Sequence, residues 1–197
     1  MIQFSPRVPF GPQFLACWVS HCEQTIENYG DHALCCRKTR DTVTRHSIVR
    51  NWVFRLAKDG LLCPEIEKVG VGPAETSRRP ADVALPIWAN GKGLAIDVAI
   101  VCPLAPSHLD EIEPCESYAW GQKHRLYDAG FIHSQYDFVA MVFESGGAVN
   151  EEGEAILKQL FRFASKRSTM SHSRFAGRAW SPLVLASEGR HPNDLKQ

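Results

Sequence analysis

Residues 79–101 read RPADVALPIWANGKGLAIDVAIV, and this stretch decides the fold. Val83, Leu85 and Ile87 share one face by period-two counting, which predicts a strand over 82–88. The nearly continuous apolar run over 94–104 predicts a second strand that is buried on both faces. Asn90-Gly91 lies between the two runs and is a strong signal for a hairpin turn. The sequence therefore predicts a hairpin that carries a charged residue, Asp97, inside its buried strand.

The segments on either side of this hairpin complete an α/β pattern. Apolar residues at helical spacing predict helices over 42–60, from 115 to 126 and over 152–164. Strand-like runs occupy 61–71 and 138–143. The order helix, three strands, helix, strand, helix predicts an α/β sandwich around a small mixed sheet.

The composition fits one domain of ordinary size. The chain has 197 residues and 22.0 kDa, with 44% hydrophobic and 22% charged residues, as soluble globular proteins do. Because 22 basic residues balance 22 acidic ones, nucleic-acid binding would have to rest on local basic patches. We divide the chain into a Cys/His segment at 1–40, the α/β domain at 41–165 and a partly disordered extension at 166–197.

Nothing in the sequence predicts a membrane partner. No apolar run approaches the roughly 18 residues that cross a bilayer, and the first residues, MIQFSPRVPF, lack the order of a signal peptide. We therefore expect an intracellular protein. In a reducing compartment, clustered Cys and His residues indicate a metal more often than disulfides.

Two acidic residues of the predicted hairpin are candidates for chemistry. Asp82 begins the first strand and Asp97 lies fifteen positions later in the second, so a turn at Asn90-Gly91 can bring their carboxylates together. Two such carboxylates repel each other unless a cation lies between them, and oxygen ligands suit Mg²⁺ or Mn²⁺. Such an ion can activate water for phosphodiester hydrolysis, with a nearby Lys to orient the water or offset negative charge.

The ordered set of segments resembles the restriction-endonuclease-like, or PD-(D/E)XK, nucleases. More narrowly, it is similar to the C-terminal endonuclease domain of site-specific non-LTR retrotransposon polyproteins and their stand-alone relatives. The resemblance spans roughly residues 17–165 and rests on Gly30-Asp31-His32-Ala33-Leu34, Arg45-His46, Arg79-Pro80-Ala81-Asp82-Val83, Ala95-Ile96-Asp97-Val98, Lys123 and 138–145. It implies a nuclease fold with an αβββαβ core, an N-terminal zinc-knuckle-like segment and a metal-dependent DNA endonuclease activity.

The resemblance also implies roles for individual residues. Asp82 and Asp97 match the metal-binding carboxylates, and Glu67 on the preceding strand is a third acidic contributor, for which Glu65 could substitute. The Lys that the superfamily places two positions after the second carboxylate is replaced by Ala99. Lys123, in the following helix, matches the Lys that takes this role in the retrotransposon-type nucleases.

Cys and His residues near the N-terminus have the spacing of a metal site. Cys17, Cys22, His32 and Cys36 form C-x4-C-x9-H-x3-C, a set that suits a tetrahedral structural Zn²⁺. The retrotransposon-type proteins carry a similar Cys-Cys-His-Cys knuckle, usually with a shorter first interval. His21 could therefore replace Cys17, and Cys35 could replace Cys36.

Basic residues flank the proposed site and are candidates for binding DNA. Arg45 and His46 lie one turn before a buried helix position, Arg79 precedes the first Asp, and Arg125 follows Lys123. The resemblance implies DNA as the partner, with RNA or an element-encoded reverse transcriptase as further candidates and the nucleus as the compartment in a eukaryotic cell. It leaves the oligomeric state open.

Each candidate also has a structural interpretation. Asp82 can bond to turn amides at a strand start, Asp97 can pair with Arg45, and Lys123 can be a surface Lys whose stem covers apolar area. The alternative function is a catalytically inactive nucleic-acid-binding module that keeps the nuclease fold. Ala99 and the long first Cys interval both favour that alternative.

Overall fold

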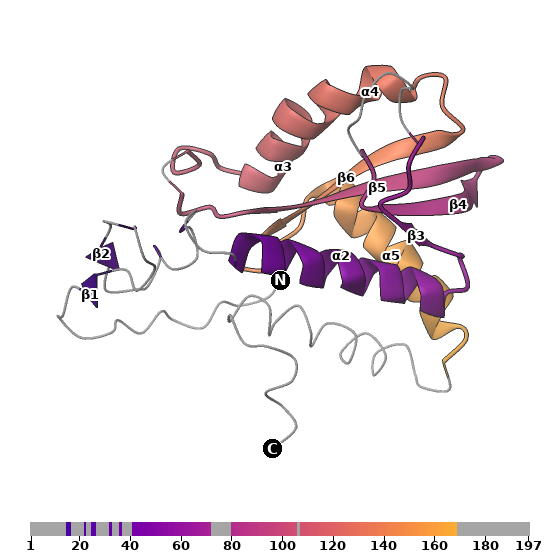
Figure 1. Cartoon of the computed structure of the whole chain (residues 1–197), viewed down its shortest axis with the longest axis horizontal. Coiled ribbons are helices and arrows are strands. Elements are labelled where there is room, and N and C mark those ends of the chain that lie inside the picture. Colours follow the sequence, from indigo (N-terminus) through magenta and orange to yellow (C-terminus); the bar gives the residue numbers. More distant parts are fainter. Residues whose placement is uncertain are drawn as a thin grey trace.

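Two helical layers enclose a four-stranded sheet in the computed structural model of the chain (Figure 1). The structure describes residues 15–16, 22, 25–26, 32, 36, 41–71, 80–105 and 107–168. The predicted α/β class, the small mixed sheet and the order helix, three strands, helix, strand, helix are confirmed. Cys17, Arg79 and the chain after residue 168 lie outside the described residues.

The helices divide between the two faces of the sheet. Helices α2 (Asp41–Asp59) and α5 (Glu151–Ser165) pack on one face, where Trp52 and Val53 meet Leu157 and Leu160 in the largest core cluster. The other face is covered by α3 (Pro114–Tyr118), the π-helical turn η1 (Ala119–His124) and α4 (Arg125–Phe131). Among the described residues, no helix is both long and apolar enough to cross a membrane.

The predicted hairpin forms the centre of the sheet. Strand β4 (Val83–Ala89) pairs antiparallel with β5 (Lys92–Val101), and Ala89 pairs with Lys92 across a two-residue turn. Asn90 and Gly91 have φ of 52° and 77°, the left-handed values that a type I′ turn requires. Strand β5 lies between β4 and β6, and helices cover both faces of the sheet, so β5 is buried on both faces, as its apolar run predicts.

The strand predicted over 61–71 is wrong in length. Only Glu65–Ile66 form a strand, β3, which pairs with Val83 and Ala84 at the edge of the sheet. Leu61, Cys63 and Glu67 have positive φ, so the backbone leaves the extended conformation on both sides of this pair. The alternation of charged and apolar side chains in this segment therefore does not reflect a continuous strand.

The second predicted helix is broken by a π-helical turn. Cys115, Tyr118 and Ala119 point toward the sheet as the periodicity predicts, but η1 then inserts a wider turn before α4. A π-helical turn contains more residues than an α-helical turn, so each residue after it lies at a different angle around the helix axis from the one that α-helical spacing predicts. Leu126, predicted to face inward, is consequently exposed, and His124 is buried instead.

The last strand, β6 (Tyr136–Glu144), runs parallel to β5 and forms the opposite edge of the sheet. The buried Asn150 side chain acts as a substitute neighbour for this edge. Its Oδ1 accepts a hydrogen bond from Val142 N at 2.9 Å, and its Nδ2 donates to the Ala140 carbonyl at 2.9 Å. Polar backbone groups that would be exposed at the edge are thereby satisfied within the chain.

Candidate functional site

The site lies at the end of β5 that extends past its neighbour β4. The last pair between the two strands is Val83 with Ile96, whereas β5 continues to Val101. Beyond Ile96 the edge of β5 that faces β4 has no strand partner among the described residues. Side chains take over there: Val98 N donates to Asp82 Oδ2 at 2.7 Å, and the Val98 carbonyl lies 3.0 Å from His46 Nε2. The uneven strand lengths thus create an open edge lined by functional groups.

Asp82 forms hydrogen bonds with this edge of β5 and is largely shielded from solvent. The residue lies in a bend before β4, where its backbone N–H donates to the Ile96 carbonyl at 2.9 Å and its carbonyl accepts from Glu67 N at 3.0 Å. Its side chain is mostly buried and bonds to Val98 N and His46. The Asp82 carboxylate thus accepts from a backbone amide of β5, across the open edge.

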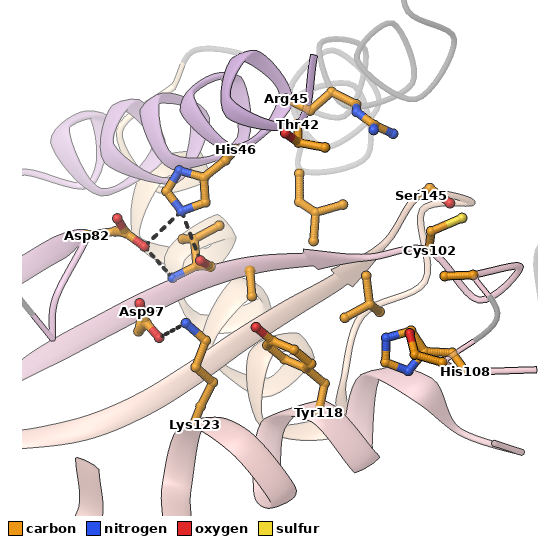
Figure 2. Close-up of a pocket in the computed structure, with 16 residues that line it drawn as sticks. Thr42, Arg45, His46, Asp82, Asp97, Cys102, His108, Tyr118, Lys123 and Ser145 are labelled. Carbon is orange, nitrogen blue, oxygen red and sulfur yellow. Dashed lines mark hydrogen bonds and ion pairs between the residues drawn. The ribbon is translucent and has the colours of Figure 1, made fainter. Parts of the chain in front are cut away.

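His46 lies on α2, above Asp82 (Figure 2). Its Nε2 is 3.2 Å from Asp82 Oδ2 and 3.0 Å from the Val98 carbonyl oxygen. A carbonyl oxygen can only accept, so Nε2 carries the proton and shares it between two oxygens. The hydrogen bond to Asp82 raises the pKa of His46, although burial and the Arg50 guanidinium oppose the shift.

Asp97 and Lys123 face each other below the sheet edge (Figure 2). Lys123 Nζ lies 2.6 Å from Asp97 Oδ2, and the two side chains are only 18% and 9% exposed. Burial raises the pKa of Asp97 to about 6, with Asp82 adding to the rise while Lys123 and His46 lower it. Burial lowers the pKa of Lys123, but the Asp97 carboxylate outweighs it and the net pKa is raised. Lys123 is therefore not a surface Lys, and Asp97 pairs with it rather than with Arg45.

The π-helical turn carries Lys123, and a residue that sequence reasoning missed anchors this turn. His124 is buried, with Nδ1 2.8 Å from Asp128 Oδ1 and Nε2 2.8 Å from Glu152 Oε2. Its ring stacks on Trp120 at 4.2 Å between centroids. Burial lowers the pKa of His124, but the two carboxylates outweigh it and raise the pKa. Asp128 follows His124 by four positions, a spacing that the sequence shows, but Glu152 comes from α5 and could not be paired with His124 from the sequence.

These groups line one cavity of about 420 Å³ along the open edge of β5 (Figure 2). Its remaining lining comes from the first turns of α2, from α3 and from the chain after β5. The labelled lining residues are Thr42, Arg45, His46, Asp82, Asp97, Cys102, His108, Tyr118, Lys123 and Ser145. Asp82, Asp97, Lys123, Arg45 and His46, all predicted from the sequence, are thereby brought together.

One end of the cavity carries carboxylate oxygens, the kind of donor that divalent cations take. Asp82 is close enough to raise the pKa of Asp97, so two carboxylates share the site. Asp97 Oδ2 is buried and makes no hydrogen bond of good geometry, although the Lys123 ammonium is near it. Asp82 Oδ2 and the Val98 carbonyl oxygen converge on the Nε2–H of His46. Hard oxygen donors of this kind suit Mg²⁺ or Mn²⁺.

Two predicted residues do not join this cavity. Glu67 borders Asp82 through its backbone, but its side chain pairs with Arg50, with Oε1 2.5 Å from the Arg50 nitrogen Nη1. Glu65, the alternative, pairs with Lys68 instead. Arg125 is exposed at the start of α4 and does not line the cavity. The positive φ of Glu67 and the π-helical turn η1 change where these two side chains point. Residue spacing in a regular strand or α-helix predicts neither change.

Cys22, His32 and Cys36 form a second cluster, separate from the cavity. Their ligand atoms all lie within 4.8 Å of one another, with Cys22 Sγ 3.2 Å from His32 Nε2 and 3.7 Å from Cys36 Sγ. Two thiols and one imidazole are suitable donors for a structural Zn²⁺. The predicted fourth donor, Cys17, its alternative His21 and the alternative Cys35 lie outside the described residues.

No protein family, curated protein or solved structure matches the chain.

Proposed function

We propose that the chain is a divalent-metal-dependent DNA endonuclease with a restriction-endonuclease-like domain. The observation that carries this proposal is the meeting of Asp82, Asp97 and Lys123 on one cavity, although they are separated by up to 41 positions in the sequence. Two carboxylates and an ammonium around an open strand edge are the groups that hydrolysis of a phosphodiester needs. The order of helices and strands agrees with the αβββαβ core that the resemblance implies.

Each residue has a role that follows from its surroundings. Asp82 and Asp97 would hold Mg²⁺ or Mn²⁺, which supplies charge stabilisation at the phosphate and lowers the pKa of bound water. Lys123, whose pKa is raised beside Asp97, stays protonated and offsets negative charge that develops on the phosphate oxygens. Arg45 and His46, which line the opposite wall of the cavity, would contact the phosphate. Lys123 thus acts as a cation and hydrogen-bond donor, not as a base.

The remaining parts of the proposal rest on the resemblance and on the second cluster. A Zn²⁺ held by Cys22, His32 and Cys36, with Cys17 as the fourth ligand, would order the N-terminal segment next to the nuclease domain. Such a segment would help to grip DNA. Origin from a retrotransposon also makes RNA or an element-encoded reverse transcriptase a partner to test.

The test compares the wild type with Asp97→Asn on supercoiled plasmid and on branched DNA. Cutting should require Mg²⁺ or Mn²⁺, stop with a chelator, and fall at least about a hundredfold in Asp97→Asn because one metal ligand charge is lost. Asp137→Asn is the matched control, since Asp137 is an exposed Asp on β6 that pairs only with Lys92 among the described residues. Equal cutting by wild type and Asp97→Asn would refute the assignment.

One observation favours the alternative, an inactive nucleic-acid-binding module. His46 and Lys123 already place protonated groups against Asp82 and Asp97, so both carboxylates have partners without a metal. Ala99 also stands where the superfamily has its Lys. Nucleic-acid binding that persists in the double variant Asp82→Asn/Asp97→Asn, with no cutting by the wild type, would support this module.

A further inference from the structure

The cavity extends well beyond its carboxylate end. Tyr118 lies between Lys123 and His108: Lys123 Nζ is 5.9 Å from the Tyr118 ring centre, and the rings of Tyr118 and His108 are 6.4 Å apart (Figure 2). His108 therefore lines the same cavity as the carboxylates but at its other end. The proposed nuclease mechanism gives His108 no role.

His108 is held in a fixed orientation by a carboxylate. Its Nδ1 lies 2.7 Å from Glu111 Oε2, and its side chain is only 18% exposed. A carboxylate accepts, so Nδ1 donates, and this fixes which ring nitrogen is turned away from Glu111. Within the described part of the chain, no group bonds to Nε2. In the imidazolium form Nε2 is an N–H donor, which a second anion would satisfy.

The two ends of the cavity differ in the charge of their lining residues. Asp82 and Asp97 are its only acidic lining residues among those described, and they lie together. The other end is bordered by His108 and by Thr42 and Arg45 in the first turns of α2, where the helix dipole is positive. Strand alternation also turns the N–H of Ile100 toward the same open edge as that of Val98.

We propose that His108, oriented by Glu111, binds a second backbone phosphate of the strand whose scissile phosphate lies at Asp82 and Asp97. This inference rests on the proposed function, because it takes the occupant of the cavity to be a phosphodiester. The protein should therefore prefer a polynucleotide strand, which carries at least two phosphates, to a diester that carries one. Basic side chains, backbone N–H groups and helix N-termini position nucleic acids through their phosphates, independently of base sequence.

The first measurement is hydrolysis of two substrates by the full chain with Mn²⁺. Oligothymidylate supplies several phosphates and bis(p-nitrophenyl) phosphate supplies one. His108→Gln should lower kcat/KM for oligothymidylate about tenfold, mainly through KM, because a charge-assisted hydrogen bond is lost. Hydrolysis of bis(p-nitrophenyl) phosphate should not change. Equal loss on both substrates, or no loss on either, would overturn the proposal.

The second measurement is binding of fluorescent oligothymidylate with Ca²⁺ in place of Mn²⁺, as a function of salt. His108→Gln should weaken binding about tenfold and reduce the salt slope by about 0.7, the value for one phosphate contact on a single strand. His108→Lys should restore the slope because it restores a cation, and Glu111→Gln should weaken binding less than His108→Gln. His133→Gln, at an exposed His outside the cavity, is the matched control.

The two measurements separate this inference from the proposed function. If the wild type hydrolyses neither substrate but His108→Gln still lowers affinity and salt slope, the nuclease assignment fails and the phosphate site stands. If the wild type hydrolyses both and His108→Gln matches it in binding and KM, the phosphate site is wrong and the nuclease stands. A wild type that binds no oligothymidylate refutes the phosphate site. A thermal melt of each variant reports whether it folds.

Discussion

His46 donates one N–H to Asp82 and to the Val98 carbonyl together, at 3.2 Å and 3.0 Å, across the open edge of β5. The ring thus occupies the point where two oxygens converge, next to the second carboxylate at Asp97. These oxygens are available because, within the described part of the chain, β5 has no strand partner on this side beyond Ile96.

Divalent metal should stabilise the protein in a pH-dependent way. The pKa of Asp97 is raised to about 6. Protonation of Asp97 therefore stabilises the metal-free fold at low pH, and this stabilisation is lost as the pH rises through about 6. Metal needs the carboxylate form, so Mg²⁺ or Mn²⁺ should raise Tm more at about pH 8 than at about pH 5. Differential scanning fluorimetry measures this, and an equal rise in Asp97→Asn would contradict it.

Lys123→Met should destabilise the domain because it leaves a buried carboxylate without its cation. We expect a loss of about 3 kcal/mol in the free energy of unfolding near neutral pH, and a smaller loss at acid pH, where Asp97 is protonated. Urea unfolding gives both values. Lys92→Met, in the exposed pair with Asp137, should cost about 0–1 kcal/mol. The double variant Asp97→Asn/Lys123→Met should recover part of the loss, and strict additivity would argue against a coupled pair.

His124→Gln should destabilise the π-helical turn most at low pH. Asp128 and Glu152 raise the pKa of His124 against the opposing effect of burial. Its contribution to stability is complete below its usual pKa of about 6.5 and is lost as the pH rises through the folded value. We expect a cost of about 2 kcal/mol near pH 6 and less near pH 9. Unfolding curves at both pH values measure it, and a cost that grows with pH would refute the charged pairing.

The second cluster should hold one zinc ion per chain. Cys22→Ser removes a ligand that lies near both His32 and Cys36, so the bound zinc should be lost or exchange rapidly with a chelator. Elemental analysis of the purified protein and chelator competition report the stoichiometry. Cys63→Ser is the control, because Cys63 is an exposed cysteine outside this cluster. Full zinc content in Cys22→Ser would exclude this site.

Asn150→Ala should weaken the edge of the sheet at β6. The substitution leaves Val142 N and the Ala140 carbonyl without their side-chain partners in a buried position, for a cost of about 2–4 kcal/mol. Gly153→Ala should act on the same contact, since a Cβ there would lie 2.6 Å from Asn150 Oδ1. Hydrogen exchange should show faster exchange of the Val142 amide in both variants. Unchanged exchange would mean that Asn150 does not support the edge.

Local patterns in the sequence determined the hairpin and the helices at its sides. Asn90-Gly91 can adopt positive φ at little cost, and the alternation of Val83 and Leu85 places one face of β4 in the core. These signals depend on neighbouring residues only, so the sequence alone supports the α/β order, and it marks Asp82 and Asp97 as unusual within apolar strands.

Only the tertiary structure decided how the site is assembled. The start of β4 opposite Ile96, the π-helical turn that carries Lys123, and the bond of the buried His124 to Glu152 all depend on residues far away in the chain. So does the pairing of Glu67 with Arg50, which removes Glu67 from the predicted set. The physical reason is that buried charges and unpaired backbone groups must find partners wherever packing places them, and sequence spacing does not encode that choice.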